Sequence, residues 1–323
     1  MKAIVQDTYG SPDVLELRDI DKPVVGDDDV LIRVHAAGVS PGVWHLMTGE
    51  PYLMRIMGFG LRKPKTRPGI DVAGRVEAVG KDVTEFQPGS EVFGDCEGSF
   101  AEYVCAGEDR FVRKPANITF EQAAAVRDSG CTALRGLRDA GEVKPGQKVL
   151  IIGAAGGVGT FAVQIAKALG AEVTGVCSTT KTDLVRSIGA DHVIDYTRED
   201  FADSRQRYDV ILDTAGRRSV SHLRRGLTPQ GTLVLIGGEG GGRWFGGVDR
   251  QLRAVMLSLF VRQKLRSPVY MKHPKEDLQF LKELIEAGKV TPVIDRTYPL
   301  SEVPEAIRYW EEGHARGKVV ITV

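Results

Sequence analysis

The segment that most constrains the fold runs from Lys148 to Ala171 and reads KVLIIGAAGGVGTFAVQIAKALGA. It begins with a short apolar run rich in β-branched residues, as a buried parallel strand does. A glycine cluster follows, and apolar residues then recur at three- and four-residue spacings, as on one face of a helix. The order of strand, tight turn and helix predicts a unit that binds a dinucleotide.

The turn itself holds four glycines, Gly153, Gly156, Gly157 and Gly159. Glycine allows a sharp turn and close backbone approach, so the free N–H groups at the helix start can bind a pyrophosphate. Ala154 departs from the common G-x-G-x-x-G pattern, and a glycine-rich packing turn is the alternative interpretation. We expect the cofactor to contact Gly153, Ala155, Gly156, Gly157 and Val158.

Composition excludes several classes of function. The chain has 323 residues, enough for about two domains. Its 43 basic and 43 acidic residues are interspersed, so we expect small-molecule partners and neither nucleic acid nor a membrane surface. The four cysteines have no zinc-finger or C-x-x-C spacing and are expected to be reduced. No apolar signal segment follows Met1, which favours a cytoplasmic protein.

The pattern of apolar segments changes near residue 118 and divides the chain into two parts. Up to Asn117 the apolar segments are short and broken by Gly, Pro and Asp, which is typical of a β domain curled into a partly closed barrel. Residues 41–65 interrupt it with a helical turn and a long apolar loop, and loops of that length are usually functional. From Ile118 onward helices and strands alternate, which predicts an α/β, doubly wound parallel sheet (Rossmann fold). Helices are expected at 121–140, 157–169, 181–188, 248–261, 275–287 and 301–312.

A final strand is expected at 318–323, and it resembles the strands of the first domain. The C-terminus should therefore complete the β domain. We therefore predict a β domain over 1–120 and 267–323 and a Rossmann domain over 121–266.

The motifs PGIDVAGRVEAVG, PGSEVFG, GSFAEYV, GADHVIDY and GKVVI occur in that order around the glycine turn. Together they resemble the medium-chain dehydrogenase/reductase superfamily, in its zinc-independent, quinone-oxidoreductase-like (zeta-crystallin-like) branch. The resemblance implies a GroES-like fold for the β domain. It also implies no metal, because Ser40 and Ile70 occupy the positions where zinc-dependent relatives have Cys and His.

The choice of nicotinamide depends on the end of the second Rossmann strand, which reads VCSTTK and carries no carboxylate for a ribose hydroxyl. Ser178 and Lys181 can instead bind a 2′-phosphate, so NADPH is expected. A solvated lysine is the alternative for Lys181. The resemblance adds a set of further cofactor contacts, namely Thr132, Tyr196, Gly237, Arg316 and Lys318, although a basic C-terminal turn is often merely solvated.

The residues expected near the reacting nicotinamide ring differ from those of the family. Relatives usually carry an Asn-Pro-x-Asp run where this chain has Ser40, Pro41, Gly42 and Val43. The resemblance places His45 at the offset of a proton-relay histidine and Tyr52 near a pocket tyrosine. We therefore take Ser40, His45 and Tyr52 as the catalytic candidates. An exposed helix face for His45 and loop packing for Tyr52 are the alternatives.

Arg127 and Asp128 replace apolar residues of the relatives, and they must form an ion pair if they are buried.

The leading hypothesis is an NADPH-dependent reductase that delivers hydride to an activated C=C of an enone or quinone, because no nucleophile is apparent and the cofactor supplies the chemistry. The alternatives are a carbonyl reductase or alcohol dehydrogenase, a reductive cyclase, and an NADPH-binding sensor or crystallin-like protein. The resemblance also suggests a homodimer through the Rossmann sheet edge, to which the apolar helix at 248–261 can contribute. A core helix has the same pattern, so the sequence leaves the oligomeric state open.

Overall fold

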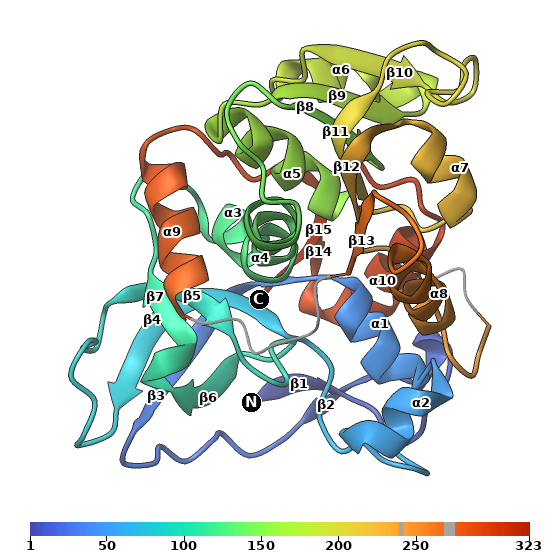
Figure 1. Ribbon diagram of the computed structural model, residues 1–323. Coiled ribbons are helices and arrows are strands. Elements are labelled where there is room, and N and C mark those ends of the chain that lie inside the picture. The colour runs from blue at the N-terminus through green and yellow to red at the C-terminus, as the bar shows by residue number, and fades with distance from the viewer. Residues whose placement is uncertain (239–241, 268–274) are drawn as a thin grey trace. The chain divides into compact units, whose positions relative to one another are not determined.

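A computed structural model describes residues 1–238, 242–267 and 275–323 of the chain (Figure 1). The described residues divide into two compact units. The first contains 1–129, 275–287 and 292–323, and the second contains 130–238, 242–267 and 288–291. Part of the segment between the helices expected at 248–261 and 275–287 lies outside the described residues.

A seven-stranded sheet forms the centre of the first unit. Its strands follow the order β14 (Ile294–Pro299), β15 (Lys318–Thr322), β3 (Asp29–Gly38), β4 (Asp71–Val79), β5 (Glu91–Asp95) and β7 (Phe111–Arg113), and β6 (Tyr103–Gly107) also pairs with β3. The path ends at β14 on one side and β7 on the other, so the predicted, partly closed barrel is confirmed. A separate hairpin pairs β1 (Lys2–Val5) with β2 (Glu16–Asp19).

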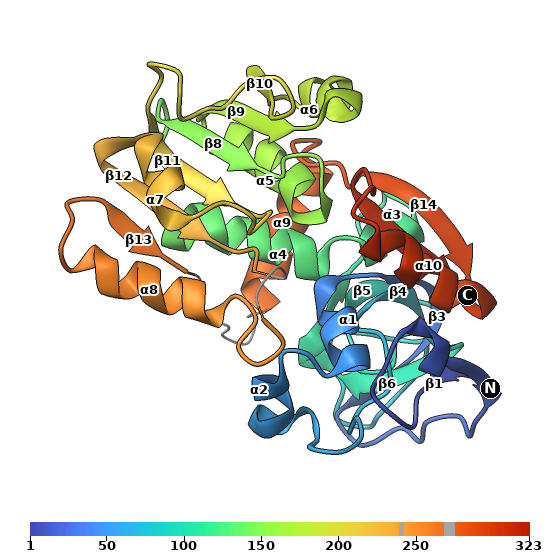
Figure 2. The same ribbon diagram turned by 90° about the vertical axis from the view of Figure 1, so that its right-hand side faces the viewer.

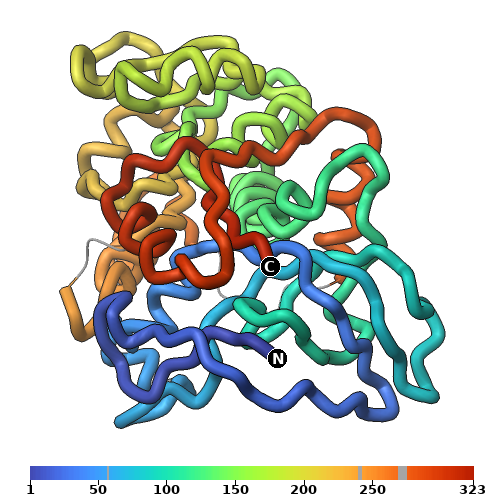
Figure 3. Tube along the Cα trace, turned by 180° about the vertical axis from the view of Figure 1, so that it is seen from behind, coloured from blue at the N-terminus to red at the C-terminus, as the bar shows by residue number. Residues whose placement is uncertain are grey.

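The C-terminal strand returns to the first unit, as the sequence predicted. Strand β15 pairs with β3 in antiparallel fashion, with Val320 opposite Gly38. Figure 3 shows the red C-terminal end of the chain near the blue N-terminal end. Helix α10 (Val303–Glu311) contributes Val303, Ala306 and Ile307 to a core that also includes Ile4 from the first strand. The two ends of the chain therefore share one apolar core, which stabilises the unit by removing apolar surface from water.

The segment 41–65 is more ordered than the expected long loop. It contains α1 (Pro41–Thr48), α2 (Tyr52–Met54) and a π-helical turn (Arg55–Phe59). The guanidinium of Arg55 donates to the carbonyls of Thr48 and Gly49 and lies over the rings of Tyr9 and Tyr52. These contacts, which the local sequence did not reveal, compact the segment. The unit also holds α3 (Phe120–Ala124) and α9 (Lys275–Glu286).

Six parallel strands form the sheet of the second unit, in the order β10 (His192–Asp195), β9 (Glu172–Cys177), β8 (Lys148–Ile152), β11 (Tyr208–Asp213), β12 (Leu227–Leu235) and β13 (Lys264–Arg266). Helices lie on both faces of this sheet (Figure 2). They are α5 (Gly157–Ala168), α6 (Thr182–Ser187), α7 (Val220–Arg225) and α8 (Val248–Ser258). The strand order reverses between β8 and β11, so the predicted doubly wound fold is confirmed.

The helix expected at 121–140 is broken. It consists of α3, α4 (Arg127–Arg135) and a π-helical turn (Gly136–Ala140). At the break, the N–H of Asp128 donates to the carboxylate of Asp71 at 3.4 Å. A side chain therefore satisfies a first-turn donor that a continuous helix would have bonded to its own backbone, and helical periodicity does not reveal such a contact.

Candidate functional site

The glycine turn lies between β8 and α5 and has the geometry of a phosphate site. Gly153 adopts a φ of +82°, which favours glycine. A Cβ atom added to Gly156 would meet only the carbonyl of Gly153, at 3.4 Å, so the turn is open there. At Gly159 the same atom would lie 2.0 Å from that carbonyl. Gly156 thus leaves room for a ligand, whereas Gly159 packs the helix against the strand, and the turn fits a pyrophosphate.

Ser178 and Lys181 lie together at the carboxyl end of β9, where Ser178 precedes the short turn Thr179–Lys181. The sequence analysis missed a carboxylate beside this turn, because it belongs to the next strand along the sheet. Asp195 accepts hydrogen bonds from the Thr179 hydroxyl at 2.6 Å and from the Thr197 hydroxyl at 2.8 Å. The Thr179 bond and the other donors lower the pKa of Asp195.

Both Asp195 oxygens therefore bind protein hydroxyls, and Ser178 and Lys181 remain the residues suited to a phosphate. Among the remaining predicted cofactor contacts of this unit, Tyr196 is exposed just after β10, and Thr132 is partly exposed on α4. Ala155 is buried and Val158 is partly exposed in the glycine turn. Gly237 is buried just beyond β12.

The three catalytic candidates lie in one short stretch of the first unit. Ser40 precedes α1 and is 1% exposed, and its hydroxyl has no hydrogen-bond partner among the described residues. His45 lies on α1, and its Nδ1 is 2.6 Å from the carbonyl of Glu50. Because a carbonyl only accepts, Nδ1 must carry a proton, which leaves Nε2 as the acceptor of the neutral ring. Tyr52, on α2, stacks with Arg55.

Lys318 has a different setting from the one the family resemblance implied. Its side chain is 3% exposed, and its Nζ donates to the carbonyl of Val39 at 2.9 Å and lies 3.8 Å from the Asp71 carboxylate. This placement favours a structural role over the expected cofactor contact, because the ammonium group already binds protein atoms. Lys318 fixes the backbone immediately before Ser40.

Arg316 lines a cavity of about 630 Å³ in the first unit. The cavity wall also includes Arg296, Tyr309 and His314, with Asp295 and Glu312 as its acidic members. The Tyr309 hydroxyl donates to Asp295 at 2.7 Å, and Arg296 lies over the Tyr309 ring. Arg316 is therefore placed where an anionic group can reach it, although acidic side chains share the wall.

Arg127 forms an ion pair, as its burial required, but with Asp95 rather than Asp128. Its Nη2 lies 2.9 Å from the Asp95 carboxylate, and both side chains are 13% exposed. Arg110 approaches the same carboxylate at 3.0 Å. The partner comes from β5, so no inspection of the local sequence around Arg127 could have named it.

Asp71 gives the first unit a titration near neutral pH. Burial raises the pKa of its carboxyl to about 7 and outweighs the opposing attraction of Lys318. Between about pH 4 and 7 the folded state therefore binds this proton more tightly than the unfolded chain, whose aspartates have a pKa of about 3.9. The contribution of the group to stability is present below pH 4 and is lost as the pH rises to 7.

We expect Asp71→Asn, which cannot titrate, to remove this dependence. The melting temperature of the variant relative to the parent should rise between pH 4 and 7 and level off above pH 7. The slope cannot exceed about 1.4 kcal/mol per pH unit. Thermal melts in buffers of constant ionic strength measure it, and a constant difference between the two proteins across this range would refute the assignment.

Comparison with known proteins agrees with this geometry. Residues 26–116 match the alcohol dehydrogenase GroES-like domain, residues 188–321 the zinc-binding dehydrogenase family, and residues 130–218 the C-terminal domain of alanine dehydrogenase/PNT. The mitochondrial NAD(P)H oxidoreductase RTN4IP1 of Mus musculus is 36% identical over 359 residues, covering 100% of this chain and 89% of the relative. The chloroplastic NADPH-dependent alkenal/one oxidoreductase of Arabidopsis thaliana is 35% identical over 347 residues, covering 99% and 79%.

Solved structures give the same result. The quinone oxidoreductase of Coxiella burnetii has a TM-score of 0.87 and 30% identity, with 100% of this chain and 99% of that chain covered. The Escherichia coli quinone oxidoreductase complexed with NADPH has a TM-score of 0.84 and 25% identity, with 100% of both chains covered. The protein belongs to the medium-chain dehydrogenase/reductase superfamily, in its quinone-oxidoreductase-like branch, and is an oxidoreductase that uses a nicotinamide cofactor.

Among the described residues, no helix has the length and apolar character needed to cross a lipid bilayer.

Proposed function

We propose that this protein is an NADPH-dependent reductase of an activated C=C bond in an enone or quinone. The observation that carries the proposal is the pairing of an open glycine turn with Ser178 and Lys181 at the end of the next strand. When bound, the cofactor supplies the hydride. The names of the relatives, quinone oxidoreductase and alkenal/one oxidoreductase, support this substrate class.

The chain's own residues would bind the acceptor and supply the proton. Protonated His45 or the Tyr52 hydroxyl can donate to the enolate that hydride addition leaves, and the buried Ser40 hydroxyl can donate to the carbonyl oxygen of the substrate. The unpartnered hydroxyl of Ser40 supports its part, because a buried donor without a partner costs free energy unless a ligand satisfies it. That Ser40 and Ile70 bind no zinc stays a prediction.

Turnover with an enone tests the reaction type. NADPH consumption should yield the saturated ketone, in which the hydride has been added to the β-carbon of the enone. An allylic alcohol would instead identify a carbonyl reductase, and a ring-closed isomer of the reduced ketone would identify a reductive cyclase. No consumption with any member of a quinone and enone panel would contradict the proposal.

Cofactor preference provides a second test. NADPH should bind more tightly than NADH, and Lys181→Ala should weaken NADPH about 10- to 100-fold by removing a charge-assisted hydrogen bond, while NADH changes little. Lys144→Ala is the matched control. Lys144 is exposed on the loop before β8, at the amino ends of the strands, whereas Lys181 lies at their carboxyl ends. Calorimetric titration measures each dissociation constant. Equal constants for both cofactors in the unaltered protein would refute the NADPH assignment.

We further propose that the protein forms a homodimer. Strand β13 lies at the edge of the second sheet. Helix α8 and the residues after it expose an apolar stripe at helical spacing, Leu252, Val255, Met256, Leu259 and Phe260. An edge strand beside an exposed apolar stripe is a typical self-association surface.

A cytoplasmic location also stays a proposal, and the names of the relatives place those proteins in mitochondria and chloroplasts.

A further inference from the structure

The guanidinium of Arg250, on α8, binds three segments of the second unit that are far apart in the sequence. Its Nη1 donates to the carbonyl of Gly237 at 3.2 Å. Its Nη2 donates to the carbonyl of Arg218 at 2.8 Å and to the carboxylate of Asp213. The Arg250 side chain is 15% exposed and that of Asp213 is fully buried. One planar fork therefore links the helix to three segments at once, from two nitrogen atoms in a fixed geometry that the compact ammonium group of a lysine does not reproduce.

Asp213 is the last residue of β11, and its polar atoms connect the ends of two strands. One carboxylate oxygen accepts from the N–H groups of Ala215 and Gly216, each at 3.2 Å. Its main-chain carbonyl accepts from the N–H groups of Ile236 and Gly237, just beyond β12. A Cβ atom on Gly237 would lie 2.4 Å from the Thr214 carbonyl, so these two backbones are in close contact.

The same assembly reaches the glycine turn. The Thr214 hydroxyl donates to the carbonyl of Ile152 at 2.8 Å, and a Cβ atom on Gly153 would lie 2.6 Å from that hydroxyl oxygen. The assembly therefore includes the carboxyl ends of β8, β11 and β12. In open parallel sheets, ligands bind in the crevice outside these ends.

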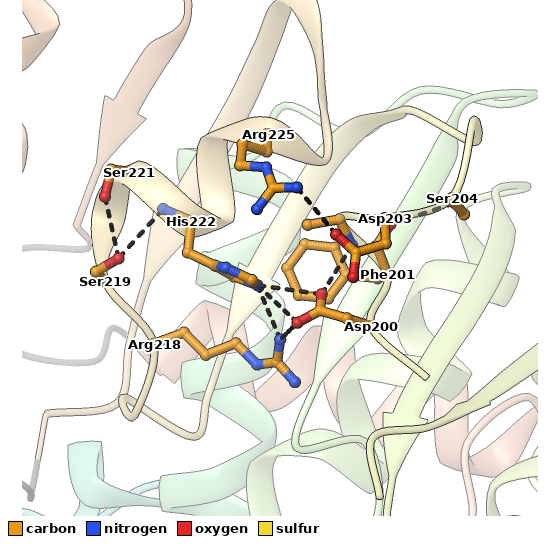
Figure 4. A network of polar contacts seen from close by, with 10 residues as sticks. Asp200, Phe201, Asp203, Ser204, Arg218, Ser219, Ser221, His222 and Arg225 are labelled. Carbon is orange, nitrogen blue, oxygen red and sulfur yellow. Dashed lines mark hydrogen bonds and ion pairs between the residues drawn. The ribbon is translucent and has the colours of Figure 1, made fainter. Parts of the chain in front are cut away.

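The carbonyl of Arg218 is a firm anchor for Arg250, because the Arg218 side chain is itself fixed (Figure 4). Its guanidinium lies 2.8 Å from the Asp200 carboxylate and 5.0 Å from the centre of the Phe201 ring. The Nε2 atom of His222 lies 3.1 Å from the same carboxylate. Arg250 therefore connects the cofactor side of the sheet to a rigid network rather than to a loose loop.

We propose that Arg250 is a positioning residue for the nicotinamide cofactor, which holds the backbone beyond β11 and β12 in the conformation that binds it. This inference rests on the proposed function only in assuming that NADPH binds at the carboxyl ends of the strands. A purely stabilising ion pair fits less well. The Nε of Arg250 is buried without a hydrogen-bond partner among the described residues, and buried ion pairs are weak sources of stability.

Arg250→Lys tests the proposal, because it keeps the charge opposite Asp213 but loses the fork. We expect the dissociation constant of NADPH to rise at least tenfold, and KM for NADPH to rise while KM for the quinone acceptor is unchanged. The double variant Arg250→Gln with Asp213→Asn, which removes both charges, should show the same weakening. Arg253→Lys is the control on the same helix, since the Arg253 side chain is 81% exposed, and it should bind NADPH as the parent does.

Titrations are made well below the melting temperature of each variant, so that stability and affinity are read separately. A folded Lys variant that binds NADPH within twofold of the parent would overturn the proposal. So would a loss of folding in both variants, because Arg250 would then serve the fold and not the site. If the unaltered protein bound no nicotinamide cofactor, the proposed function would fail instead of this inference.

Discussion

Gly159→Ala is expected to destabilise the second unit more than any other single methyl group added to the glycine turn. The new Cβ atom would lie 2.0 Å from the Gly153 carbonyl and 2.8 Å from backbone atoms of Ala154. Backbone atoms cannot rotate away as a flexible side chain can, so α5 would have to move off β8. Overpacking of this kind costs about 1–3 kcal/mol and occasionally more, and we expect the upper end.

Chemical denaturation of the two proteins measures this loss. Gly156→Ala is the matched control, because it adds the same methyl group three residues earlier, where the nearest atom is 3.4 Å away. The control should lose no more than about 1 kcal/mol, the usual size of an N-cap effect. Equal stability of the Gly159 and Gly156 variants would show that the turn is looser than described.

Gly156→Val is expected to abolish cofactor binding while the protein stays folded. Gly156 has φ −84° and ψ 177°, an extended conformation that valine adopts readily. The added side chain would occupy the open space above the turn, where the pyrophosphate must approach the helix N-terminus. We expect the dissociation constant of NADPH to rise at least about 100-fold, or about 2.7 kcal/mol.

Calorimetric titration and a thermal melt of the same sample separate the two effects. The melt should shift little, because the site lies on the open side of the turn. Normal NADPH binding by the folded variant would make the glycine cluster a packing turn only. Gly157→Val is expected to act in the same direction, since the sequence places it beside Gly156.

The sequence predicted the second unit best. Parallel strands buried on both faces give continuous apolar runs, and glycine marks where the chain must turn, so the run from Lys148 to Ala171 determined strand, turn and helix almost to the residue. The motifs around it also placed the chain in its superfamily. The β unit was predicted in outline, although its short strands β2, β6, β7 and β14 were not located individually. In the second unit the short edge strand β13 was also not located.

Charged partners could not be predicted, because they come from other strands. Arg127 meets Asp95, and Lys318 meets Asp71, across separations that no local pattern records. For the same reason the sequence suggested that no carboxylate stands near Ser178, whereas the neighbouring strand brings Asp195 beside that turn. Arg250 looks like one of several arginines on an amphipathic helix until folding buries it against Asp213.

The sequence by itself determined which backbone conformations were available, and so the dinucleotide turn and the alternation of strands and helices. Those features depend on local properties: glycine's freedom, the burial of apolar runs and the period of each element. The class of enzyme came instead from the resemblance of the sequence motifs to a known family. The tertiary structure alone decided which charges are neutralised, which hydroxyls lack partners and which glycines touch backbone. These depend on distances between segments remote in the chain, and such distances exist only after the sheets have formed.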